Sequence, residues 1–383
     1  MASSAGVEQT RLATPVATPA VDTAETGVEG ETLATPKTYR RLLRAASSYG
    51  SFQIQHADEP KSMFKTGRPL VCMTLFLCCS VMLVIEFAVN NWELESFSTN
   101  PTIGVSVSTL LELGAKRADL ILEGDWYRLI APIFLHAGIL HYLFNMFALW
   151  QIGFPLENQF GSLAAALIIL LGGFQGVVWS AILSPVTVGV GASGAIFALF
   201  GSAWSELILN WSLYKGQHCI SITQLVLATA VNLMLGLMPF LDNFAHIAGF
   251  VTGILVGFGV LVSNRFTRWG ELKERKRYQV VLQSLSVLIT PLLVVVSLLV
   301  LYLGVDADEW CTWCRYLSCV PFPPGDSPWW TCDECSDAGV TAYFVNSTTV
   351  TVYCPSSPAV NATAPDGLAD NNNLLIGLCQ EVC

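Results

Sequence analysis

Charged residues are scarce in this 383-residue sequence: Asp, Glu, Lys and Arg together make up 13%, whereas hydrophobic residues make up 53%. Soluble domains carry about 25% charged residues, so this composition argues against an ordinary soluble protein. About 20 apolar residues cross a bilayer as a helix. Seven runs reach that length, at residues 70–90, 128–150, 163–184, 192–213, 220–239, 243–263 and 281–303. The sequence therefore predicts an all-α membrane protein.

Two catalytic patterns are also missing. The sequence contains no His-Glu-x-x-His motif, the usual zinc-binding arrangement of a membrane metalloprotease. None of the seven runs has an aspartate in its interior, so the paired aspartates of an aspartyl enzyme are absent as well. We therefore expect no metal and no other cofactor, and any hydrolytic chemistry would have to rest on a serine.

No secretory signal peptide precedes the first run, so the first run is expected to act as its own insertion signal. Residues 1–66 are polar, contain repeated Ala-Thr-Pro triplets and are predicted to be a disordered tail. Lys and Arg gather before the first run and again between the sixth and seventh, which places both segments in the cytosol. We therefore expect a cytosolic tail at 1–66, a six-span core at 67–263, a basic cytosolic loop at 264–280, a seventh span at 281–303 and an external tail at 304–383.

The last segment is rich in cysteine. Eight of the twelve cysteines lie after residue 310, together with the glycosylation sequons at Asn346 and Asn361. This pattern favours disulfides in an oxidising compartment over a zinc site, although the two Cys-x-x-Cys pairs, which begin at Cys311 and Cys332, would also suit zinc. A third sequon at Asn210 falls at the cytosolic end of a span and is expected to stay unmodified. The acidic balance lies mostly in this tail and indicates no nucleic-acid partner.

Histidines are few, and three of the five fall at membrane depth: His136, His141 and His246. Strongly polar residues inside spans are costly and are functional candidates by default. Spans two, four and six all enter from the outer face, so these histidines, Asn145 and Ser193 are expected to lie at a similar depth. His141 and Asn145, four residues apart, would share one helix face.

The stretch from Gly191 to Gly201, "GASGAIFALFG", combines two features. Ser193 stands where a glycine-containing loop enters a helix, beside free backbone N–H groups. Small residues recur every four positions in two spans, so we expect spans four and six to approach closely and bring His246 to Ser193. These stripes are Gly194, Ala198 and Ser202 in span four and Ala245, Gly249, Gly253 and Gly257 in span six.

This arrangement suits nucleophilic catalysis by a serine with a histidine as base. His141, Asn145 and the Ser193 N–H could stabilise an oxyanion. Asp242 lies one turn from His246 but is more readily explained as a helix N-cap, which favours a dyad over a triad. Two other functions stay open: a transporter, with the intramembrane Glu86 and Glu206 unexplained, and a non-catalytic membrane chaperone.

Four motifs in order resemble the rhomboid intramembrane serine proteases over about residues 70–303. They are Trp126-Tyr-Arg128, His136-x4-His141-x3-Asn145, Gly191-x-Ser193-Gly194 and Ala245-His246-x2-Gly249-x3-Gly253. The resemblance implies a six-helix rhomboid core plus a C-terminal seventh transmembrane helix, as in the secretory-pathway eukaryotic and plant-type members. It also implies a multi-pass protein of the Golgi or plasma membrane that cleaves transmembrane, mostly single-span, substrates within the lipid bilayer.

The same resemblance assigns residue roles. Ser193 would be the nucleophile and His246 the general base, with His141 and Asn145 completing the oxyanion hole. Gly191 and Gly194 would support the reactive turn. The remaining matches would be structural: His136, Trp126, Arg128, Phe197, Gly249 and Gly253. Phe197 departs from bacterial relatives, which often have tyrosine there, but it could still stack on the His246 ring.

Overall fold

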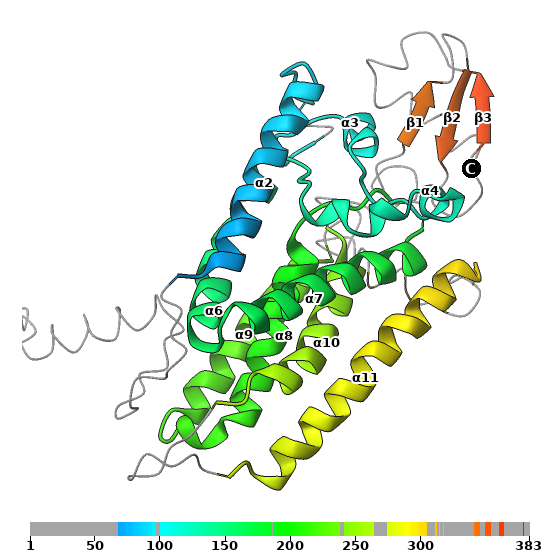
Figure 1. The fold of residues 1–383 in the computed structure, drawn as a ribbon. Helices are drawn as coiled ribbons and strands as arrows, with labels where there is room; N and C mark the ends of the chain where they lie inside the picture. The colour runs from blue at the N-terminus through cyan, green and yellow to red at the C-terminus, as the bar shows by residue number, and fades with distance from the viewer. Residues whose placement is uncertain are drawn as a thin grey trace, which may run out of the picture. The chain divides into compact units, whose positions relative to one another are not determined.

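A computed structural model gives the fold (Figure 1). It describes residues 68–96, 100–185, 187–237, 241–263 and 274–304. It also describes the single residues Cys311, Cys314, Leu317 and Leu378 and three strands between 341 and 363. The predicted N-terminal tail, most of the basic loop and most of the C-terminal tail lie outside the described residues.

Helices account for most of the described chain. Six are long and apolar enough to cross a membrane, one of them made of three consecutive helical segments, and α8 is a shorter apolar helix. In chain order the helices are α2 (Leu70–Val89), α3 (Val107–Glu112), α4 (Ala118–Glu123), the 3-10 turns η1 (Trp126–Leu129) and η2 (Ala131–Ile133), α5 (Ile139–Ala148), the π-helical η3 (Leu149–Gly153), α6 (Phe154–Phe160), α7 (Ser162–Leu183), α8 (Ser193–Leu209), η4 (Trp211–Leu213), α9 (His218–Leu235), α10 (Asn243–Val260) and α11 (Arg277–Tyr302). The predicted all-α membrane fold is confirmed.

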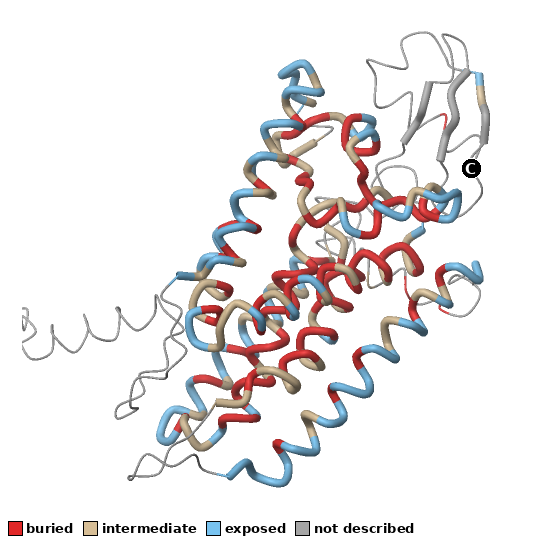
Figure 2. The backbone as a smooth tube through the Cα atoms, viewed as in Figure 1, coloured by how far each residue is buried: buried red, intermediate tan, exposed pale blue. Residues whose placement is uncertain are grey.

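Helices α7, α8 and α10 form the buried centre (Figure 2). A Cβ atom at Gly249 would lie 2.1 Å from the Gly194 carbonyl oxygen, and one at Gly253 would lie 2.0 Å from the Ala198 carbonyl oxygen. The predicted close approach of these two helices is therefore present. Helix α7 adds a third glycine face, since a Cβ at Gly172 would lie 2.1 Å from the Ala198 Cβ. Small residues let all three backbones meet, as is common in membrane proteins.

The second span differs from its predicted range of 128–150. The apolar helix begins at Ile139 and runs through η3 and α6 to Phe160. The residues before it are apolar but form the short 3-10 turns η1 and η2, the second of which contains Pro132 near its start. Gly138 then meets the loop at Thr102, where a Cβ would lie 2.4 Å from the Thr102 carbonyl oxygen. Hydropathy does not distinguish such short apolar turns from a helix.

Two carboxylates hold the first long helix in place. Both oxygens of Glu157 accept hydrogen bonds from the first turn of α2, from Val71 N and Cys72 N, each at 2.8 Å. At the other end of α2, the buried Glu86 accepts a 2.9 Å hydrogen bond from the backbone N–H of His136. Because a helix N-terminus presents unpaired N–H groups, Glu157 acts as a cap supplied by another helix.

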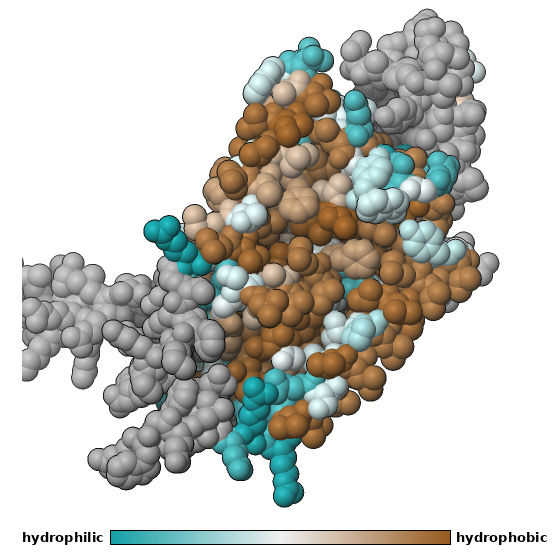
Figure 3. All heavy atoms as spheres, in the orientation of Figure 1, coloured by the Kyte–Doolittle hydropathy of each residue, from teal (hydrophilic) through white to brown (hydrophobic). Residues whose placement is uncertain are grey.

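The helix surface is apolar. Figure 3 shows hydrophobic side chains over most of the visible helices, with hydrophilic residues toward the helix ends. The last helix, α11, packs on α7 and α10 along one side and presents apolar side chains on the other. Polar bonds reinforce this contact: Gln175 Nε2 and Trp179 Nε1 on α7 both donate to Ser297 Oγ on α11, at 3.1 and 2.9 Å. Apolar outer faces with polar inner contacts suit helices surrounded by lipid.

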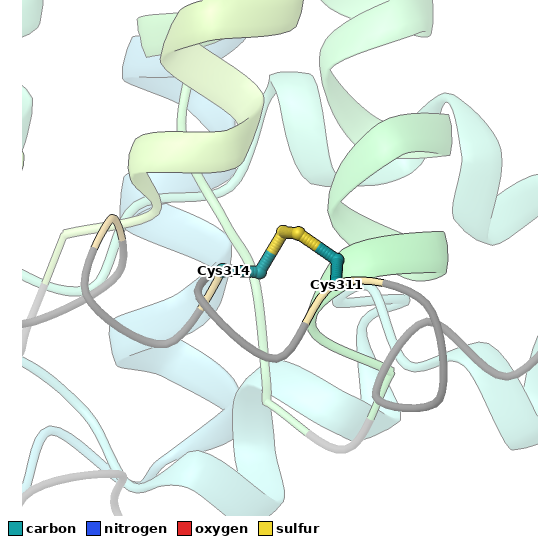
Figure 4. The surroundings of a disulfide bond; sticks show 2 residues. All are labelled: Cys311 and Cys314. Carbon is teal, nitrogen blue, oxygen red and sulfur yellow. A yellow bond between two sulfur atoms is a disulfide. The ribbon is translucent and has the colours of Figure 1, made fainter.

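The described part of the C-terminal tail contains one disulfide and one small sheet. Cys311 and Cys314 are joined (Figure 4), which confirms the prediction of disulfides in this tail, for which no pairing had been predicted. Strands β1 (Thr341–Phe344), β2 (Thr349–Tyr353) and β3 (Val360–Thr363) form an antiparallel sheet in that order. The sequence analysis did not predict this sheet, although these segments are rich in threonine, valine and tyrosine, which favour strands. Asn361 lies in β3, and Asn346 and Cys332 lie outside the described residues.

Candidate active site

Ser193 is the first residue of α8, and its side chain is half-buried. No side chain caps this helix, so the N–H groups of its first turn are free of capping partners. Gly191, two residues earlier, has φ +125°, a backbone conformation that residues other than glycine rarely adopt. Its N–H donates to the Pro132 carbonyl at 2.8 Å, so Gly191 shapes the turn and is not itself a free donor.

Two side-chain donors converge on this turn from α5. A Cβ at Gly191 would lie 2.9 Å from His141 Nε2 and 3.6 Å from Asn145 Nδ2. His141 Nδ1 accepts from the Ala137 N–H at 3.4 Å, which puts the ring proton of a neutral His141 on Nε2. Asn145 Nδ2 is buried and has no hydrogen-bond partner. Both groups can therefore donate to a ligand beside Gly191.

His246 is buried in the first turn of α10, and its ring stacks on Phe197 with centroids 4.1 Å apart and planes 8° apart. Phe197 follows Ser193 by four residues on α8, so both lie on the face that meets the His246 ring. Within the described chain, Ser193 Oγ makes no hydrogen bond to His246.

Asp242 caps α10 and does not orient the histidine. One of its carboxylate oxygens accepts from Ala245 N at 3.0 Å, and the other accepts from Ser180 Oγ. His246 Nδ1 is buried without a partner. The predicted N-cap role of Asp242 is therefore confirmed.

A cavity with an empty volume of about 260 Å³, including its open part, adjoins the serine. Its lining includes Gly191 and Ser193 on one side and Lys116 and Asp242 on another. The lining thus joins the reactive turn to two charged residues from separate parts of the chain.

The other predicted positions surround this group. His136 lies in the loop before α5 and not on the helix with His141, contrary to the predicted single helix, because the helix begins only at Ile139. Its buried ring lies edge-on to His141, with centroids 5.5 Å apart. Arg128 Nη1 donates to the Leu111 and Ala115 carbonyls at 2.7 and 3.0 Å. Trp126 is 66% exposed and takes no part in the cluster.

Two residues next to the site were not recognised in the sequence. Lys116 is buried, reaches carbonyls just before the reactive turn and lines the cavity beside Ser193. Pro132 supplies the carbonyl that fixes Gly191. Lys116 stands beside Arg117 and close to Glu112 and Asp119, so nothing in the sequence marks it as a buried lysine, and a backbone carbonyl leaves no trace in a sequence.

The intramembrane carboxylates left unexplained by the sequence have structural partners. Glu86 binds the His136 N–H, as described above. Glu206 accepts from Tyr214 and from Asn210 Nδ2. Asn210 is fully buried and also donates to the Leu261 carbonyl at 2.8 Å, so its sequon is inaccessible in the folded protein. Both oxygens of Glu206 therefore have partners, whereas Glu86 Oε1 is bonded and Glu86 Oε2 is buried without a partner among the described residues.

Comparison with known proteins identifies the family of this chain. A rhomboid domain matches residues 123–263. RHOMBOID-like protein 4 of Arabidopsis thaliana is 35% identical over 76% of this chain and 74% of its own length. Inactive RHOMBOID-like protein 8 of the same plant is 31% identical over 67% of this chain and 74% of its own. Rhomboid protease GluP of Bacillus subtilis is 33% identical over 52% of this chain and 37% of its own. Because a rhomboid domain matches and RHOMBOID-like protein 4 is 35% identical over 76% of this chain, the chain belongs to the rhomboid family.

Proposed function

We propose that this chain is an intramembrane serine protease that uses a Ser193–His246 dyad. Ser193 Oγ attacks the scissile carbonyl while His246 takes the hydroxyl proton, and His246 then returns that proton to the leaving amine. Water hydrolyses the resulting acyl-enzyme and regenerates the serine. The similarity to GluP supports a protease in general, and the dyad is the finer part of the proposal.

The observation that carries the proposal is the convergence of donors on the reactive turn. His141 Nε2 and Asn145 Nδ2 both face Gly191, and Asn145 Nδ2 has no partner within the protein. Leaving a buried donor unpaired costs about 1–3 kcal/mol, so such a group indicates a ligand. An oxyanion beside Ser193 would satisfy both donors and the N–H groups of the first α8 turn.

A non-catalytic chaperone is the second candidate, because one relative carries the word inactive in its name. Here both members of the dyad are retained, which favours the protease. For the chain itself we propose seven crossings, with the N-terminus in the cytosol and the C-terminus outside, in the Golgi or plasma membrane. Substrates would be transmembrane proteins, mostly single-span, cut near the outer face.

The test is covalent labelling of the detergent-solubilised protein with a fluorophosphonate, followed by peptide mapping. We expect one adduct, on Ser193, because only an activated serine reacts readily with this reagent. Heat-denatured protein serves as the control and should remain unlabelled. Native protein without an adduct on Ser193 would contradict the protease and leave the chaperone.

Replacing Asn145 with alanine should lower kcat by about 10²–10³-fold, the usual loss for one oxyanion-hole donor. The fold should persist, because Nδ2 makes no hydrogen bond that the substitution would break. Cleavage of a reconstituted single-span reporter measures the effect. Asn232→Ala is the matched control, since Asn232 Nδ2 bonds only to the Ala228 carbonyl of its own helix. Equal kcat values for the two variants would remove Asn145 from the oxyanion hole.

A further inference from the structure

The loop that delivers Ser193 is held by a residue far from it in sequence. We define the connector as residues 184–192, between α7 and α8. Its backbone pairs with the segment before α4: Lys116 N donates to the Gly189 carbonyl at 2.9 Å, and Gly189 N donates back to the Lys116 carbonyl at 3.1 Å. Ala118 N donates to the Pro185 carbonyl at 3.1 Å. The connector is therefore fixed on one side by backbone bonds.

The Lys116 side chain fixes the other side. Its Nζ donates to the Ser184 carbonyl at 2.8 Å, to the Thr187 carbonyl at 2.9 Å and to Thr187 Oγ1 at 3.0 Å. A longer contact of 3.5 Å reaches the Ser180 carbonyl at the end of α7. The side chain is 1% exposed, so the ammonium has exchanged its water for these oxygens. One cation thus joins the end of α7 to the connector.

This cation also faces the cap of the histidine helix. A Cβ at Gly189 would lie 2.8 Å from Lys116 Cε and 3.1 Å from Asp242 Oδ2, so both side chains approach the connector at Gly189. Asp242 in turn caps α10 at Ala245 N, and its backbone carbonyl accepts from His246 N at 3.2 Å. Lys116 and Asp242 therefore bracket the connector at the point where the elements bearing Ser193 and His246 meet.

We propose that Lys116 is a positioning residue for the reaction: its ammonium holds the connector against the capped end of α10, so that Ser193 is presented to His246. The inference rests on the proposed function for its catalytic consequence, but the hold on the connector can be measured by itself. Neither the rhomboid motifs in the sequence nor the comparisons assign this lysine a role.

The charge of Lys116 distinguishes positioning by its ammonium from mere packing of its side chain, because only the former depends on pH. Burial lowers the pKa of Lys116 to about 8, against the opposing attraction of Asp242 on α10 and Asp119 by α4. Asp119 is paired with Arg117 at 2.5 Å, and Arg128 donates to the neighbouring Ala115 carbonyl. These are the charged groups around the ammonium. Raising the pH through about 8 should remove its charge and release the connector.

The test uses the full-length protein, with Lys116→Met as the main variant. At pH 7 we expect faster hydrogen exchange at the connector amides, unchanged KM and a kcat lower by about 10–100-fold, the scale of a small misplacement of reacting groups. Wild-type activity should fall above pH 8, whereas the variant should show a low, flat profile there. Thr187→Val removes one acceptor of the Lys116 ammonium, so it should also make exchange faster and kcat lower, each by a few-fold. Lys215→Met, at an exposed position, should change neither.

Hydrogen exchange and fluorophosphonate labelling together distinguish failure of the Lys116 positioning role from failure of the proposed protease function. Unchanged connector exchange in both Lys116→Met and Thr187→Val, with normal fluorophosphonate labelling, would overturn the positioning role and leave the protease intact. Wild-type protein that fails to label would overturn the protease and, with it, the catalytic half of this inference. An alkaline fall in activity that persists in Lys116→Met would also overturn it, because another group would then be titrating.

Discussion

Ser193→Ala is expected to abolish cleavage of a single-span reporter, with a loss of about 10⁶-fold in kcat, the scale seen when a serine nucleophile is removed. The physical reason is that Ser193 carries the proposed nucleophilic hydroxyl two residues after Gly191, where the donors of His141 and Asn145 converge. Folding should be unaffected, because Ser193 Oγ is half-buried and makes no hydrogen bond within the described chain. Product formation in proteoliposomes and the thermal unfolding of the same sample measure the two effects.

The control for this variant lies two turns further along the same helix. Ser202 is fully buried, and its hydroxyl donates only to the Leu199 carbonyl of its own helix at 2.8 Å. Ser202→Ala should therefore keep nearly all activity. Ser193→Ala should also retain the intact reporter in a co-purification, because binding does not need the hydroxyl. Cleavage that continues in Ser193→Ala at the wild-type site would refute the serine mechanism.

The position of Ser193 at the start of a helix was predictable because it depends on the local sequence. Gly191, Ser193 and the four-residue spacing of the small residues on two helices sit in short stretches, and their geometry follows from helix periodicity. His141 and His246 lie in the first turns of α5 and α10, and Ser193 begins α8, which is the arrangement that the depth argument expects; their depth in the membrane stays a prediction. Helix starts on one side of a membrane can be compared from a sequence without knowing how the helices pack.

The features that the sequence analysis missed depend on contacts between residues that are far apart in the chain. Lys116 acts on Thr187, 71 residues later, and no pattern in the sequence joins them. Before α5, Gly138 meets the Thr102 carbonyl and the chain is not helical, so hydropathy placed the start of the span at residue 128, whereas the helix begins at Ile139. Gly172 and Gly176 on α7 face Ala198 and the Ala245 carbonyl, yet their own spacing does not say which helix they meet. Tertiary contacts decided each of these cases.

Gly249→Val should have the largest effect on the fold. A Cβ at this position would lie 2.1 Å from the Gly194 carbonyl oxygen and 3.1 Å from Gly194 Cα, both of which are backbone atoms that cannot turn aside. Helices α8 and α10 must then separate, at a cost of about 3 kcal/mol, the upper end of the usual range for overpacking. Thermal unfolding in detergent measures this loss.

The same substitution should nearly abolish activity, because Gly194 follows Ser193 directly and Gly249 lies one turn after His246. Moving the two helices apart by about 1 Å can cost about 100-fold in rate. Val251→Ala is the control on the same helix, since Val251 is 42% exposed and faces away from this contact. It should leave both rate and stability near the wild-type values. If Gly249→Val instead unfolded and cleaved like Val251→Ala, the close contact of α8 with α10 could not be what brings His246 to Ser193.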